Sequence, residues 1–187
     1  MTALQNDVTR NAASAVGFSR MRRRIFIYGL TLLTLSLIQT TVLHLVPILG
    51  TIPDLCLLFV LGTAMFDGAE NGGAVGIAAG FLENALGGVG ISLLPLLFFV
   101  VGYGTGLLAG KALARTFPSY MIFALVFCLL RPAITLADIG LSAHTSGFGL
   151  NAITEGTLVP EFFANLVAAP PMYLLIRKTN RLIQKKK

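Results

Sequence analysis

Lysine and arginine are confined almost entirely to three short parts of the chain, and the segments between them are strongly apolar. Of the 14 lysines and arginines, all but Arg131 lie before residue 25, between Lys111 and Arg115, or from Arg177 onward. Because basic residues beside membrane spans favour the cytoplasmic side, this pattern predicts three cytoplasmic segments separated by pairs of membrane-crossing helices.

The composition excludes an ordinary soluble globule. The 187 residues are 55% hydrophobic and 12% charged, with a mean hydropathy of +0.81, which leaves too little polar surface to cover a water-soluble domain. The net charge of +6 does not indicate nucleic-acid binding, because the basic residues flank apolar runs and there is no tryptophan. Anionic lipid headgroups are the expected partners of the basic tails.

Six apolar runs form the predicted spans of an all-α integral membrane protein with both termini cytoplasmic. An even number of spans returns both basic tails to one side, and an inverted topology would place thirteen basic residues outside. The first run is longer than the roughly 7–15 residues of a signal-peptide core, so an anchor is expected. The predicted spans are 25–46, 53–66, 72–86, 91–114, 118–140 and 157–176, giving a basic tail over 1–24, a single transmembrane domain over 25–177 and a basic tail over 178–187.

The second span is short and is expected to be tilted or shielded by protein. Pro53 suits a first helical turn, and Asp54 would there face the positive end of the helix dipole. A turn over 67–71 is predicted to lead to the third span, and a glycine-rich stretch over 87–90 to the fourth.

Glycines at four-residue spacing mark one face of the third span and one face of the fourth. Such faces allow close backbone approach between membrane helices. Packing on neighbouring helices is the simpler interpretation, and contact with another membrane protein is the alternative. These helix-packing glycines are Gly72, Gly76 and Gly80, continued by Asn84, and Gly102, Gly106 and Gly110, continued by Ala114.

Ionisable residues inside spans are the stronger functional indicators, because each is costly in hydrocarbon and needs a partner or water. The predicted span directions place all of them central to outer and leave the inner half nearly bare. The predicted intramembrane polar network comprises Asp54, Glu83, Asn84, Arg131, Asp138, Glu161 and Asn165, with Gln39 at the same depth.

Arg131 is expected to anchor this network by pairing with one or more of the four carboxylates. Pro132 follows it and predicts a kink, and Pro170-Pro171 predict a bend in the last span. The network could be an ion pair that locks the bundle, or a site that a partner or ligand recognises; the sequence leaves both open.

No constellation indicates an enzyme, a cofactor or a metal site. His44 and His144 have no metal-binding spacing, and neither a nucleophile elbow nor a phosphate-binding loop is present. Cys56 and Cys128 lie within apolar runs and are expected to be small buried hydrophobes.

Several short motifs, taken in order over 25–178, resemble the rod shape-determining MreD family. They are Gln39-Thr40-Thr41, Pro53-Asp54-Leu55, Gly76-x-x-x-Gly80 with Gly87-Gly88, Gly102-Tyr103, and Glu161, Asn165, Pro170 and Arg177-Lys178. The family often carries an aspartate where this chain has Asn84, with Glu83 just before it.

The resemblance implies a non-enzymatic scaffold of the bacterial cell-elongation complex in the inner membrane. Its implied partners are MreC, the glycosyltransferase RodA with a class B penicillin-binding transpeptidase, and, directly or indirectly, MreB. The implied fold is similar to the S components of energy-coupling-factor transporters. The alternative function is therefore a substrate-capture subunit for a vitamin-like small molecule.

Overall fold

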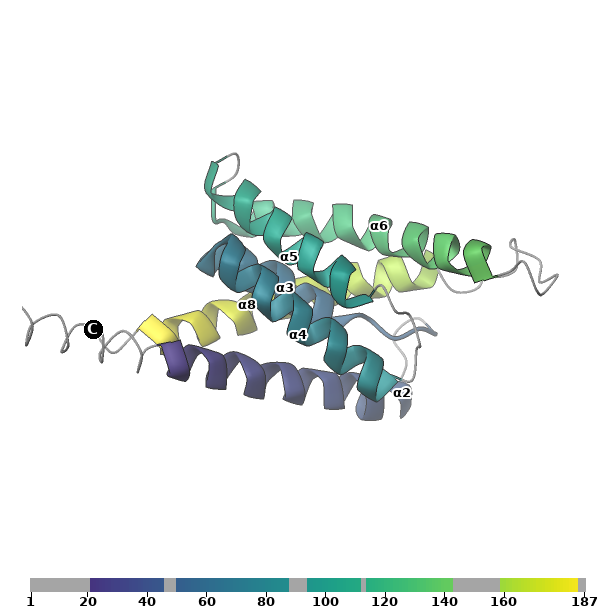
Figure 1. The fold of residues 1–187 in the computed structure, drawn as a ribbon, viewed down its shortest axis with the longest axis horizontal. Coiled ribbons are helices and arrows are strands. Elements are labelled where there is room, and N and C mark those ends of the chain that lie inside the picture. Colours follow the sequence, from purple (N-terminus) through teal and green to yellow (C-terminus); the bar gives the residue numbers. More distant parts are fainter. Residues whose placement is uncertain (1–20, 46–49, 88–93, 112–113, 143–158, 185–187) are drawn as a thin grey trace, which may run out of the picture.

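The computed structural model describes residues 21–45, 50–87, 94–111, 114–142 and 159–184, and their regular structure is helical, as predicted. Successive long helices run in opposite directions along one long axis, which is horizontal in Figure 1. An N-terminal helix starts the described chain at Met21 and continues directly into η1. The other elements are η1 (Ile38–Val42), α2 (Leu43–Leu45), α3 (Leu55–Asp67), α4 (Ala69–Gly87), α5 (Leu94–Lys111), α6 (Phe117–Ser142) and α8 (Val159–Gln184).

Two helices in the described part of the chain are long and apolar enough to cross a membrane, Met21–Val42 and Leu94–Lys111. The apolar helix α3, Leu55–Asp67, falls below that length, and the first part of α6, Phe117–Leu130, is also apolar. Spanning the hydrocarbon core of a bilayer takes roughly 20 helical residues, so α3 could not cross it unaided.

Several element boundaries differ from the predicted ones, among them the following three. Pro53 precedes α3 instead of lying in its first turn, because Asp54 is the N-cap. The predicted turn over 67–71 shrinks to Gly68, whose φ of 89° lets α4 begin at once at Ala69. The last helix continues to Gln184, so much of the predicted basic tail is helical.

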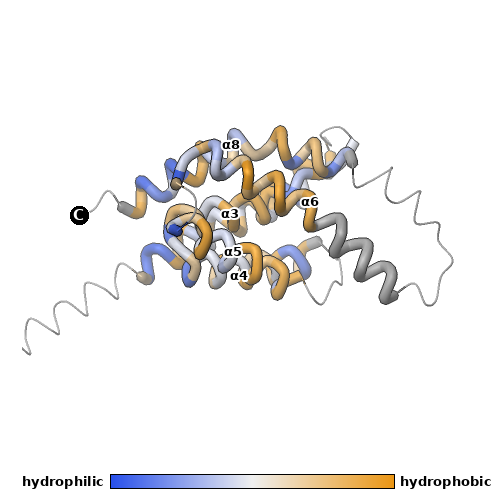
Figure 2. The backbone as a smooth tube through the Cα atoms, turned by 90° about the horizontal axis from the view of Figure 1, so that it is seen from above, coloured by the Kyte–Doolittle hydropathy of each residue, from blue (hydrophilic) through white to orange (hydrophobic). Residues whose placement is uncertain are grey.

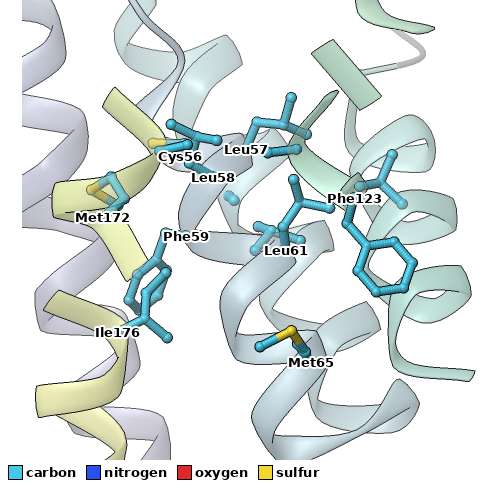
Figure 3. Close-up of a cluster of buried hydrophobic side chains, with 14 of the residues drawn as sticks. Cys56, Leu57, Leu58, Phe59, Leu61, Met65, Phe123, Met172 and Ile176 are labelled. Carbon is cyan, nitrogen blue, oxygen red and sulfur yellow. The ribbon is translucent and has the colours of Figure 1, made fainter. Parts of the chain in front are cut away.

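Helix α3 forms the centre of the bundle and is buried on all sides. Its side chains meet Phe123 of α6 on one flank and Met172 and Ile176 of α8 on the other (Figure 3). Phe59 and Leu61 of α3 are completely covered. The expectation that this short helix is shielded by protein is confirmed, and burial on every face explains why its sequence shows no polar stripe.

Helices α4 and α5 pack through the predicted glycine faces. A Cβ on Gly76 would collide with the backbone of Phe98, one on Gly80 with Pro95, and one on Gly102 with the backbone of Gly72. Gly106 meets Ala69 in the same way, whereas a Cβ on Gly110 would have nothing within 4 Å. Gly72 packs closely against Ala64 of α3 as well as against Gly102. Five of the six glycines thus serve close helix packing, and Gly110 is the exception.

Candidate functional site

The N-terminus of α3 is the point at which polar side chains from different helices meet. A helix start leaves its first backbone N–H groups without partners inside the helix. Asp54 satisfies one of them, since its Oδ1 accepts a hydrogen bond from the N–H of Leu57 at 2.8 Å. The carboxylate side chain of Asp54 is 1% exposed, so this cap is an interior feature of the bundle.

Gln39 supplies the second acceptor, from the N-terminal helix. Its Oε1 accepts from the N–H of Leu55 at 3.0 Å and from the N–H of Cys56 at 3.4 Å. Gln39 lies in η1, a π-helical segment, and a π turn changes the direction in which the following side chains point. One amide oxygen thereby serves two helix-terminal donors.

Asn165 supplies the third acceptor, from α8. Its Oδ1 accepts a hydrogen bond from the N–H of Asp54, and its side chain is 1% exposed. Three side chains therefore hold the start of α3, and two of them, Gln39 and Asn165, are more than a hundred residues apart in the sequence. We call Gln39, Asp54, Glu83 and Asn165 the α3 cap cluster.

Glu83 joins the cluster from α4. Its Oε1 accepts from the amide Nε2 of Gln39 at 3.4 Å, so Gln39 bridges the start of α3 and the carboxylate of Glu83. Glu83 is 7% exposed, and the carboxylate of Glu161 lies within electrostatic range of it. The carboxylate that contacts Gln39 thus comes from Glu83, one position before Asn84.

Most residues of the predicted intramembrane polar network lie in or near the cap cluster. Asp54, Glu83 and Asn165 come together in the cap cluster, Glu161 approaches Glu83, and Asn84 is partly buried beside it on α4. The side chains of Arg131, Asp138 and His44, and the whole of His144, lie outside the described residues. The predicted pairing of Arg131 therefore stays a prediction.

The chemistry of the cap cluster is that of a structural hydrogen-bond network. The hydrogen bonds described above run from backbone N–H groups to its members or join two of its members. In an apolar surrounding each of these N–H groups would cost several kcal/mol if left unsatisfied. Among the described residues, no three His, Cys, Asp or Glu side chains gather closely enough to hold a metal ion.

A second polar group, which the sequence reasoning missed, lies at the opposite end of α3. The carboxylate of Asp67 accepts a hydrogen bond from the hydroxyl of Tyr28 and lies 3.8 Å from the guanidinium of Arg24. Its side chain is only 3% exposed. Asp67 falls in the predicted turn over 67–71, outside the predicted spans, so the burial of its carboxylate was not anticipated from the sequence. The one sequence signal is an aspartate that ends an apolar run directly before a glycine.

Basic residues from all three basic segments gather at this same end. Arg115 donates to the carbonyl of Phe66 at 3.1 Å, and Arg23 donates to the carbonyl of Leu182 at 2.9 Å. The start of the N-terminal helix and the end of α8 consequently lie together, as Figure 1 also shows. In Figure 2 the most hydrophilic parts of the described helices lie mainly at this end, where the C-terminus is marked.

Large apolar side chains cover the outside of the described helices. Phe26 is 71% exposed, Phe81 64% and Leu174 64%, and each stands on a different helix. Soluble monomers rarely expose contiguous apolar patches of more than a few hundred Å². The described helices therefore have an apolar exterior around a mainly apolar core, in which the cap cluster is buried.

Comparisons with protein-family models, with curated proteins and with solved structures find no match to this chain.

Proposed function

We propose that this chain is a multi-pass protein of the bacterial cytoplasmic membrane, with its basic end in the cytosol. The observation that carries this proposal is the apolar exterior, exposed on the N-terminal helix and on α4, α5, α6 and α8. Lipid is the solvent in which such a surface is stable. The clustering of basic side chains at one end supports the orientation.

Within that membrane, the proposed role is a non-enzymatic docking subunit of the cell-elongation complex that binds MreC. Support comes from residues that carry the family resemblance and also have defined structural roles. Gln39, Asp54 and Asn165 hold one end of α3, while Gly76 and Gly80 bring α4 against α5. RodA, its transpeptidase and MreB would then associate through the same complex, and anionic lipids would contact the basic end.

Affinity purification in a mild detergent tests this role. A tagged chain is expected to recover MreC at a roughly constant ratio to itself, whereas another multi-pass inner-membrane protein carrying the same tag recovers none. Repeated absence of MreC, under conditions that keep other membrane complexes intact, would contradict the proposed docking role.

The alternative, substrate capture for a transporter, rests on the same polar side chains near the start of α3. It predicts a stoichiometric vitamin-like molecule bound to the purified protein. Native mass spectrometry distinguishes the two, because a docking subunit is expected to release no such molecule when it is denatured.

A further inference from the structure

A cavity of about 500 Å³ lies between the N-terminal helix and α4, away from the α3 cap cluster. On the N-terminal helix it is lined by Ile25, Gly29 and Leu32, and on α4 by Ala74 and Ala78. These positions repeat every three to four residues, so each helix gives one continuous face to the cavity. Small residues on both walls leave the space open.

Tyr28, which itself lines the cavity, holds the N-terminal helix to Asp67, and Gln39, further along the same helix, holds it to α3 and Glu83. A Cβ added at Gly29 would meet nothing within 4 Å. The N-terminal helix is thus held to the bundle at Tyr28 and Gln39, while Gly29 and the small residues of α4 leave open space beside it.

One end of the cavity carries positive charge, and apart from Tyr28 and Asn71 the remaining lining residues are apolar. Arg24 lines that end, and Arg22 and Arg23 line an adjoining shallow cavity together with Ile25 and Phe26. Arg22 and Arg23 are exposed, and the negative charge of nearby Asp67 is covered by Tyr28 and Arg24. The unmatched charge at this end is therefore basic.

We propose that this cavity holds one acyl chain of an anionic glycerophospholipid of the cytoplasmic leaflet, with the lipid phosphate against Arg22 and Arg24. The basic end of the cavity matches the charged headgroup of such a lipid, and the apolar remainder matches its acyl chain. Phosphate also pairs well with guanidinium. The inference rests on the proposed membrane location and orientation, but not on the proposed binding of MreC.

The size of the cavity favours an acyl chain over a partner helix. A helix with its side chains is about 10–12 Å across and rises about 5.4 Å per turn, so one turn alone occupies roughly 400–600 Å³. The cavity could admit about one turn, whereas a spanning helix needs roughly 20 residues. An unbranched chain is much thinner and can extend along both helix faces.

Native mass spectrometry of the purified full chain tests the site with two probes, phosphatidylglycerol and phosphatidylcholine with the same acyl chains. The wild-type chain is expected to retain one phosphatidylglycerol more tightly than phosphatidylcholine. Gly29→Leu fills the cavity and is expected to lower that retention about tenfold. Gly104→Leu is the matched control, because Gly104 on α5 also has open space around it, and it is expected to retain the lipid.

A second pair of variants tests the headgroup contact. Arg22→Gln with Arg24→Gln is expected to abolish the preference for phosphatidylglycerol, whereas Arg177→Gln with Lys178→Gln, two exposed residues of α8, leaves it unchanged. Ala78→Leu fills the cavity from the other wall and should reproduce the Gly29→Leu result.

Equal lipid retention by the Gly29→Leu and Gly104→Leu chains would overturn the proposal. So would equal binding of the two lipids to the wild-type chain, or cross-linking of a cysteine at position 29 to a polypeptide, whether a second helix or residues 1–20. Retained lipid without recovered MreC would instead contradict only the docking role.

Discussion

At the scale of single residues, the start of α3 depends on acceptors from outside the helix. Asn165 accepts the N–H of Asp54 in a fully covered position, and no solvent can replace it there. An unsatisfied buried donor costs about 1–3 kcal/mol.

Asn165→Leu is accordingly expected to destabilise the protein by about 1–3 kcal/mol, because the leucine leaves the Asp54 N–H without an acceptor. Thermal unfolding can be followed with a thiol-reactive fluorophore, since Cys56 and Cys128 are free and buried until the protein unfolds. Val167→Ala, at an exposed position of the same helix, serves as the control and should unfold near the wild-type temperature. An unchanged Asn165→Leu midpoint would show that this hydrogen bond does not hold the helix.

Gly76→Ala tests the contact between α4 and α5. The added Cβ would collide with the Phe98 backbone, which cannot move as a flexible side chain can. Overpacking of this kind costs typically about 1–3 kcal/mol. The same measurement on Gly104→Ala is expected to show no loss, since nothing lies within 4 Å of that position. Equal midpoints for both variants would contradict the close approach of the two helices.

Much of this residue-level detail could be predicted, and the remainder depends on tertiary structure. Periodic spacing identified Gly76 and Gly102 as packing residues, and an apolar run after Asp54 indicated a helix start. The contact of Gln39 with that start depends on the π-helical segment η1, which no local pattern in the sequence announces. Tyr28 and Asp67 lie 39 residues apart, so only the fold brings them together.

At the scale of elements, α3 behaves as a short central helix fixed at both ends. Gln39 and Asn165 hold its first turn, and Arg115 and Gly68 lie at its last. The sequence predicted the existence and order of the helices well because their apolar runs are long. It placed several boundaries incorrectly, because hydropathy extends through capping residues and across a one-residue turn such as Gly68.

A double-mutant cycle tests whether the first turn of α3 acts as one unit. Gln39→Leu and Asn165→Leu each remove acceptors from that turn. If either loss frays the turn, the second substitution has less left to break, so the pair should destabilise by less than the sum of the single effects. The coupling is expected to be about 0.5–3 kcal/mol by the same unfolding measurement. Strict additivity would indicate two independent contacts.

At the scale of the whole molecule, the described helices are apolar on their exterior as well as in their core, unlike those of a water-soluble bundle. Buried acceptors cap the central helix, exposed phenylalanines and leucines cover the outside, and arginines gather at one end. Composition and the positions of the basic residues indicated the apolar exterior and the basic end. The cavity between the N-terminal helix and α4 was not predictable, because its walls come from two segments that are distant in the sequence and that only the fold brings together.

Cysteine labelling of the two chain ends tests the central claim most directly. Single cysteines at positions 19 and 186, in a Cys56→Ala, Cys128→Ala background, are probed in intact cells with a membrane-impermeant maleimide and again after permeabilisation. The account predicts a membrane-bound protein in which both positions react only after permeabilisation. Labelling of either position in intact cells, or recovery of the chain in the soluble fraction, would contradict it.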